Sequence, residues 1–276
     1  MSLAVVERHR TELTLLRDLA VQDLSQVVAL IRGLDVVEAR ELLKDALPDL
    51  MDPFMGAASD AAAQLLDELY AIVGEAPPEL ARPSGLWTPE RVDSLARWAV
   101  TPLVDDSLDS SVLTRLTGAA ARGIFDASRL TVVDGVTRNS DGRRVYFQRV
   151  PRPGACAFCQ MLASRPQYMA YKTEESAGAV AGRGSTRTGY DEFGNSLAGG
   201  RGGGIKARGT QELGEKYHDE CHCVSVPMIG GAVSESLAES RAKYEDLYQQ
   251  VVQTNERGVV DLKATLSAWR QEHGAH

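Results

Sequence analysis

Apolar residues recur at steps of three and four through the first 130 residues, which is the spacing of helices that bury one face. Gly33 follows the first such stripe, at the position where a glycine commonly ends a helix. The sequence therefore predicts a long amphipathic helix that ends near this glycine. Its inward residues are Leu13, Leu16, Ala20, Leu24, Val27 and Ile31.

Capping residues and prolines predict the next two helices. Asp35 followed by Glu38 supplies an N-cap and an acid at the third helical position, so a second helix begins there and is expected to stop at Pro48. Pro53 is expected to open a third helix, because its missing N–H would be unbonded in a first turn anyway. This helix runs to Gly74 on the apolar residues Ala61, Leu65, Leu69 and Ile72.

A proline-containing segment, residues 75–87, is the predicted linker to further helices. Thr88 and Pro89 begin a short helix that carries Val92, Leu95 and Trp98. Another helix is predicted over about residues 109–131, with its inward face formed by Val112, Leu116, Ala120 and Ile124. No strand pattern occurs before about residue 130.

Beyond that point the pattern changes to short strands. Residues 144–150 and 223–227 are β-branched or aromatic and predict two strands, each next to a pair of cysteines. Between them, residues 178–209 hold 11 glycines in 32 positions and show no apolar periodicity, which predicts a mobile insert.

Two helices are predicted at the C-terminal end. Ser236 and Glu239 form a capping-box pattern that is expected to open a helix to about Val252. A last amphipathic helix follows from the spacing of Val259, Leu262, Leu266 and Trp269.

Composition excludes two classes of protein. The chain has 276 residues, of which 43% are hydrophobic and 25% charged, so it can bury a substantial core and is not a disordered chain. No apolar run approaches the roughly 18 residues that cross a bilayer, which argues against a membrane protein. The N-terminal residues lack the pattern of a secretory signal, so we expect synthesis in a reducing cytosol.

Charge is distributed unevenly behind a formal net value of −8. Residues 1–109 carry 9 basic and 20 acidic residues, whereas residues 138–210 carry 12 basic and 5 acidic residues. This asymmetry suits a protein held in an assembly near nucleic acid, and it equally suits solvated helix faces with an arginine-rich loop.

All four cysteines fall in two short clusters that carry the candidate chemistry. A Cys-x-x-Cys pair is followed, 58 residues later, by a His-x-x-Cys-x-Cys pattern. Thiolate and imidazole are the ligands of tetrahedral Zn²⁺, so we predict a zinc site. It takes Cys156 and Cys159 with two or three of His218, Cys221 and Cys223, while His222 is a weaker candidate.

Three other interpretations of the cysteines stay open. They could form two disulfides in an oxidising setting, act as a redox Cys-x-x-Cys pair, or be unrelated buried residues. If zinc binds, four or more thiolate and imidazole ligands leave no open position for substrate, so the site is expected to be structural and to clamp the two strands. No nucleophile elbow, P-loop or His-Glu-x-x-His motif occurs, and we expect no small-molecule substrate.

The expected fold is mainly α with a small α+β metal-binding module, in which short strands surround the Cys/His site. We expect a helical, acidic region at 1–135, the Cys/His module at 136–230 and C-terminal helices at 231–276.

The residues around the two clusters resemble the MuF-like minor capsid (minor head) proteins of tailed phages, in particular the actinobacteriophage branch. The resemblance covers about residues 144–228 and rests on Arg149-Val150-Pro151, on 155–165 (ACAFCQMLASR), on 217–223 (YHDECHC) and on Val226-Pro227. It implies a structural protein made in the host cytoplasm and placed inside the head near the portal, where it assists head assembly and DNA packaging or ejection.

Portal, capsid or scaffold proteins are the partners that this resemblance implies, with no membrane. Packaged DNA is a further partner, expected to be contacted through phosphates by Arg183, Arg187, Arg201, Lys206 and Arg208. Two other hypotheses stay open: a capsid maturation protease, as relatives are often described, and a host zinc-module protein that binds nucleic acid. No histidine is well placed for a catalytic triad on sequence grounds, which favours a protein without enzymatic activity.

Overall fold

The computed structural model describes residues 2–77, 79–80, 86–104, 109–138, 146–164, 183–184, 205–206, 223–256, 258 and 260–274. Within these residues the chain forms seven helices and two two-stranded sheets, so the prediction of a mainly helical fold is confirmed. The helices are α1 (Ser2–Ile31), α2 (Val36–Val73), α3 (Pro89–Val104), α4 (Asp109–Arg138), α5 (Ala157–Ala163), α7 (Gly230–Val251) and α8 (Leu262–His273). The strands are β1 (Phe147–Val150), β2 (Arg183–Gly184), β3 (Ile205–Lys206) and β4 (Val224–Pro227).

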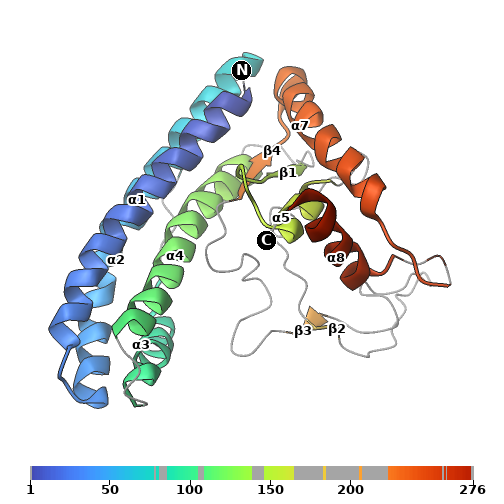
Figure 1. Cartoon of the computed structure of the whole chain (residues 1–276). Coiled ribbons are helices and arrows are strands. Elements are labelled where there is room, and N and C mark those ends of the chain that lie inside the picture. The colour runs from blue at the N-terminus through green and yellow to red at the C-terminus, as the bar shows by residue number, and fades with distance from the viewer. Residues whose placement is uncertain are drawn as a thin grey trace, which may run out of the picture.

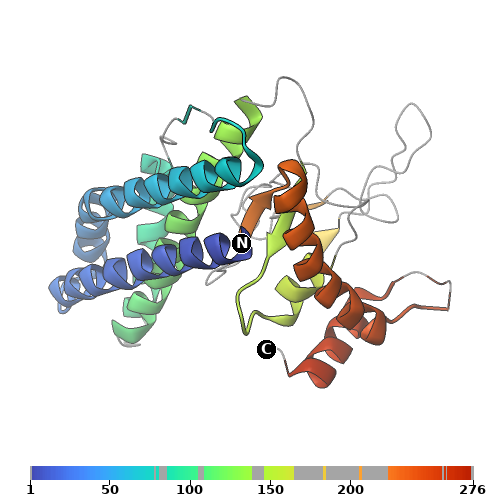
Figure 2. The same cartoon turned by 90° about the horizontal axis from the view of Figure 1, so that it is seen from above.

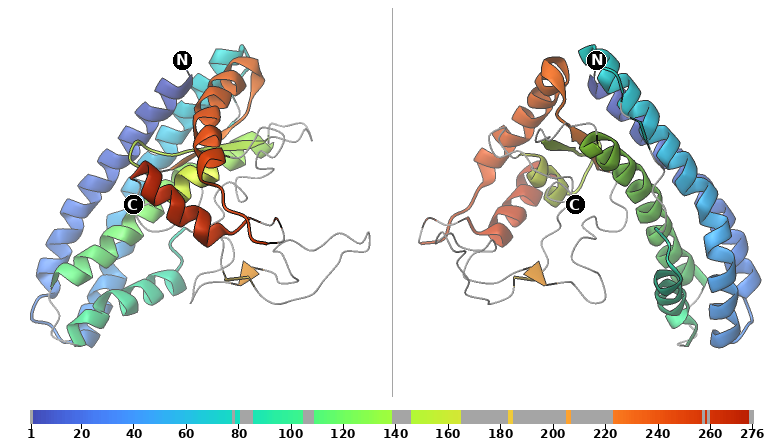
Figure 3. Two further views of the ribbon diagram at one scale, coloured as in Figure 1. Left: turned by 45° about the vertical axis from the view of Figure 1, so that its right-hand side comes forward. Right: turned by 180° about the vertical axis from the view of Figure 1, so that it is seen from behind.

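Helices α1, α2 and α4 lie side by side as a long bundle, and α3 packs at one end of it (Figure 1). The β1–β4 pair lies at the other end, between the bundle and α7, while α5 and α8 lie farther from the bundle (Figures 1 and 2). Figure 3 shows that α7 diverges from the long helices. Its N-terminal end, which follows β4, lies closest to them.

The turn between α1 and α2 follows the predicted signals. Gly33 has φ of +85°, a conformation that a glycine adopts without the strain that a Cβ would bring. The carboxylate of Asp35 accepts hydrogen bonds from the N–H groups of Val37 and Glu38, and the Glu38 side chain reaches back to the Asp35 N–H. The capping box is therefore confirmed, and it fixes where α2 begins.

The predicted break between a second and a third helix is wrong, because α2 continues through Pro48 and Pro53 to Val73. Pro53 is exposed and Pro48 is half-buried, so neither belongs to the buried face of the helix. The buried stripe of the helix stays in register past both prolines, so packing against the bundle outweighs the local break. This stripe consists of Leu43, Leu47, Met51 and Met55.

The segment before α3 is anchored to α4 by a close approach. A Cβ at Gly123 would lie 2.8 Å from Nε1 of Trp87, so the indole packs directly on the α4 backbone. The inward face predicted for α4 is buried, and the helix extends past residue 131 because Val132 and Val136 continue the stripe into a second core. Trp98 of α3 lies on the solvent side, 44% exposed.

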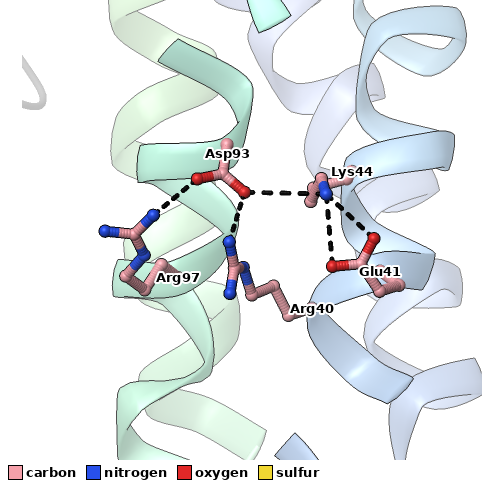
Figure 4. A network of polar contacts seen from close by, with 5 residues as sticks. All are labelled: Arg40, Glu41, Lys44, Asp93 and Arg97. Carbon is pink, nitrogen blue, oxygen red and sulfur yellow. Dashed lines mark hydrogen bonds and ion pairs between the residues drawn. The ribbon is translucent and has the colours of Figure 1, made fainter. Parts of the chain in front are cut away.

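Polar contacts on the surface join α2 to α3 (Figure 4). Asp93 accepts hydrogen bonds of 2.6 Å from both Arg40 and Arg97, and Lys44 approaches the same carboxylate while it pairs with Glu41. The hydrogen bond from Arg40 is the main reason that the pKa of Asp93 lies below its usual value.

The second core lies where the bundle meets the small sheet. It combines residues of α1, α2 and α4 with residues of β1, β4 and α7, so apolar packing is continuous from the bundle to the sheet. The two strands pair antiparallel, with Phe147 opposite Pro227 and Val150 opposite Val224. Both predicted strands are thereby confirmed, within one or a few residues of the expected bounds.

The C-terminal helices differ from the prediction at one boundary. Helix α7 begins at Gly230 after Ile229, and Ser236 and Glu239 lie inside it rather than at a cap. Ile229 is buried in the second core directly after β4, so tertiary packing sets the start of the helix. Helix α8 begins at Leu262, and the carboxylate of its N-cap residue Asp261 accepts a hydrogen bond from the Ala264 N–H. Among the helices of the described residues, none has the length and apolar character needed to span a bilayer.

Candidate cysteine centre

Three of the four cysteines meet at one end of the β1–β4 pair. Cys223 directly precedes Val224, which lies opposite Val150, the last residue of β1. From Val150 the chain turns through Gly154, with φ of +69°, and the Ala155 N–H donates to the Arg152 carbonyl at 3.0 Å. This turn returns the chain toward the sheet and leads directly into Cys156.

Helix α5 carries the Cys-x-x-Cys pair. Cys156 is its N-cap residue and Cys159 lies in its first turn. Cys159 and Cys223 are buried, Cys156 is partly buried, and the three pack together with Ala155 as a separate cluster. The arrangement brings the first cysteine pair next to Cys223, the one residue of the second cluster within the described part of the chain.

A buried positive charge lies beside these sulfurs. Arg149 is 1% exposed, and its Nη2 donates to Sγ of Cys159 at 3.6 Å. The guanidinium thus places a buried hydrogen-bond donor and a positive charge directly against the sulfur of Cys159.

Amide side chains hold α5 in place. Nε2 of the buried Gln148 donates to the carbonyl of Ala163 at 3.0 Å, at the end of the helix. On the opposite side, Gln160 is bonded to both Ala155 and Trp269 of α8. The helix that presents Cys159 is thus fixed from β1 and from the C-terminal end of the chain.

Two more buried arginines attach the sheet to the bundle beside the cysteines. Arg10 of α1 donates from Nη2 to the carbonyl of Val150 at 2.9 Å. Arg129 of α4 donates from Nη2 to the carbonyl of Cys223 at 3.0 Å, and its Nη1 pairs with Asp126 at 2.8 Å. These contacts satisfy carbonyls at the strand ends that lead into the cysteine segments.

The zinc prediction stays a prediction. His218 and Cys221, as well as the weaker candidate His222, lie outside the described residues, so their positions relative to the other cysteines are not given. In the described part of the chain, no group of three or more histidine, cysteine or acidic residues forms a ready cation site. The donor set is nevertheless of the right chemistry, since two thiol groups are buried side by side next to a guanidinium.

Two of the predicted DNA contacts can be placed. Arg183 in β2 and Lys206 in β3 lie directly opposite each other in the antiparallel pair. Arg187, Arg201 and Arg208 lie outside the described residues. The backbone thus brings two of the five basic positions together at one point of the insert.

A serine–histidine contact occurs inside the bundle, away from the cysteines. His9 Nε2 and Ser128 Oγ share a hydrogen bond of 2.8 Å between α1 and α4, and both residues are buried. Burial is the main cause that lowers the pKa of His9 to about 4, so the imidazole is neutral at pH 7. A substrate could not reach this pair without opening the bundle.

Sequence reasoning did not identify the three buried arginines. Arg149 is the one charged residue of β1 as the structure bounds it, but the strand predicted from the sequence, residues 144–150, also holds Arg144, so no signal singled Arg149 out. Arg10 and Arg129 lie on helices among many exposed charges, and nothing in the spacing distinguishes them.

The fold and the cysteine centre define a predominantly helical protein in which a small, cysteine-bearing sheet is fastened to the end of a helical bundle. The model of the VG15 protein family matches residues 1–251, from α1 through α7. The chain therefore belongs to the VG15 family, a family of phage and viral proteins. No curated protein and no solved structure matches the chain significantly.

Proposed function

We propose that this phage-family protein is a structural minor capsid protein of a tailed phage. It lies inside the head near the portal and assists head assembly and DNA packaging or ejection. Family membership supports the viral context. The MuF-like, actinobacteriophage-type resemblance of residues 144–228 supports the particular role in the head.

The observation that carries the proposal is the convergence of Cys156, Cys159 and Cys223 at one end of the β1–β4 pair. In the proposed protein this centre holds a structural Zn²⁺, with His218 and Cys221 as further ligands. The cluster around the cysteines contains few apolar side chains besides Ala155, so a metal bound to both cysteine segments would stabilise the module.

Charge supports the proposed partners. The acidic helices α1 and α2 offer surfaces for portal, capsid or scaffold proteins, and the basic insert around Arg183 and Lys206 offers phosphate contacts to packaged DNA. A structural rather than enzymatic role fits a site in which four or more protein ligands leave no position for substrate.

Virion incorporation tests the role in the head. Mass spectrometry of purified virions of the encoding phage should find the chain in a few copies, and co-expression with the portal protein should yield a joint complex. A chain that is present in the infected cell but absent from virions and from portal complexes would contradict the proposal. The protease hypothesis would replace the structural role if replacement of His218 left the major capsid or scaffold protein uncleaved.

Elemental analysis tests the zinc centre. Purified, freshly reduced wild-type protein should contain about one zinc per chain, and Cys159→Ser should lose it and melt at a lower temperature. His222→Ala is the matched control, since it removes a neighbouring imidazole outside the preferred ligand set and should retain the metal. Wild-type protein without metal would refute the zinc centre while leaving the capsid role to the virion experiment.

A further inference from the structure

Helix α8 covers the helix that carries the Cys-x-x-Cys pair. Trp269 is 0% exposed and packs with Ala157 of α5 and Val251 of α7. The views in Figures 1 and 3 both place α8 next to α5, at the end of the chain that returns from α7. The span matched by the family model ends at residue 251, so this contact comes from a segment beyond it.

The contact continues as a short chain of hydrogen bonds to the first cysteine. Nε1 of Trp269 donates to Oε1 of Gln160 at 3.0 Å, and Nε2 of Gln160 donates to the carbonyl of Ala155 at 2.5 Å. The backbone N–H of Gln160 also donates to the carbonyl of Cys156 at 3.1 Å. The Gln160 side chain therefore holds Ala155, the residue directly before Cys156, and its backbone N–H closes the first turn of α5 on Cys156.

We propose that α8 is a latch for the cysteine centre, with Trp269 and Gln160 as its positioning residues. When α8 is docked, Gln160 holds the Ala155–Cys156 turn so that Cys156 and Cys159 face Cys223. Undocking of α8 leaves the Gln160 amide without its indole donor and loosens the Cys156–Cys159 pair. The latch thereby sets how fast thiol reagents react with these cysteines and how fast thiophilic cations such as Zn²⁺ bind and leave. The inference rests on the proposed function and adds control of access to the same centre.

Cys223 provides an internal reference for this proposal. It lies at the start of β4, and its carbonyl is held by Arg129 of α4 rather than by α8. Loosening of the latch should therefore expose Cys156 and Cys159 more than Cys223, although the three sulfurs pack together. A general loss of stability exposes all three cysteines together.

The experiment compares alkylation rates of each cysteine by iodoacetamide, followed by mass spectrometry, in reduced, metal-stripped full-length protein. Trp269→Phe keeps an aromatic ring but removes the indole N–H that donates to Gln160. Gln160→Met keeps the length of the side chain but removes both hydrogen bonds of its amide group. Trp269→Phe should raise the rates at Cys156 and Cys159 about fivefold relative to Cys223, the effect of one lost hydrogen bond, and Gln160→Met, which loses two, should raise them at least as much. Trp98→Phe, at an exposed tryptophan of α3, should leave the ratio unchanged.

Unchanged ratios in both variants would overturn the latch, and so would equal increases at all three cysteines. Zinc transfer from loaded protein to a chromogenic chelator is the second readout and should be faster in the same two variants. If wild-type protein holds no zinc but the alkylation ratio shifts, the latch stands and the zinc centre fails. If zinc is present and the ratio does not shift, the latch alone fails.

Discussion

The helical bundle and the cysteine module are held together by different interactions. In the bundle, α1 to α4 bury an apolar core of more than twenty side chains, and the charged contacts, such as those of Asp93, lie outside it. In the module, the cluster around the cysteines contains Ala155 and three cysteines, and it is bounded by buried arginines and amides. Stability is thus spread over many contacts in one region and concentrated in a few polar contacts in the other.

Because of this difference, the loss of an apolar side chain in the bundle and the loss of a polar contact at the module should have different effects. A cavity in the bundle should lower the free energy of unfolding without changing the geometry of the cysteines, because no single apolar contact positions them. Loss of one polar contact at the module should disturb the cysteines directly. The predictions below test this separation in order of decreasing effect.

The largest effect is expected from a cavity in the bundle. Leu24→Ala removes a fully buried side chain of α1 and should lower the free energy of unfolding by about 3 kcal/mol, as measured by urea denaturation. Leu30→Ala is the matched control on the same helix, since Leu30 is 67% exposed and its loss should have little effect. The relative alkylation rates of the three cysteines should not change in either variant; a shift in Leu24→Ala would show that the two regions are not separable.

A smaller loss is expected when the link between α4 and the sheet is removed. Arg129→Met keeps much of the side-chain volume but removes the hydrogen bonds that Arg129 donates to the Cys223 carbonyl and to Asp126, which should cost about 2 kcal/mol. Alkylation of Cys223 should rise more than that of Cys159. Arg97→Met, which removes an exposed arginine of α3, is the control and should be nearly neutral. Equal stability of the two variants would contradict a role for the buried arginine.

His9 makes the stability of the bundle depend on pH. Its pKa is about 4 in the folded chain and near 6.5 when unfolded, so only the unfolded state binds the proton between these values. Above pH 6.5 there is no penalty, and below it stability should fall by about 1.4 kcal/mol per pH unit until pH 4. Denaturation at pH 7, 6 and 5 should show this slope in the wild type and in Ser128→Ala, and a flatter slope in His9→Gln. Parallel slopes in all three would assign the pH dependence to other groups.

The comparison also shows what the sequence could predict. The stripes of α1 and α4, the capping box at Asp35 and the glycine ends at Gly33 and Gly74 depend on local signals, and the structure confirms them. Pro48 and Pro53 carry a local signal that tertiary packing overrides, because a proline outside the buried face can be tolerated when that face packs against the bundle.

The cysteine spacing indicated a candidate centre but not the residues that support it. Cys156, Cys159 and Cys223 lie together, while the zinc site predicted from the spacing stays a prediction. The contacts of Arg129 with Cys223 and of Trp269 with Gln160 join residues about 100 positions apart. No periodicity or spacing encodes such pairs, since they arise only when separately folded helices pack.

The smallest effect is expected at the surface network of the bundle. Asp93→Asn removes the carboxylate that joins Arg40, Lys44 and Arg97, and the melting temperature should fall only slightly at low salt. The difference from the wild type should vanish near 1 M salt, where the screening length is about 3 Å. Because Arg40 lowers the pKa of Asp93, this contribution should also disappear as the pH falls below the usual aspartate range near 4. Asp18→Asn, which affects an exposed pair within α1, is the control. A loss as large as that of Arg129→Met would show that the bundle, too, depends on single polar contacts.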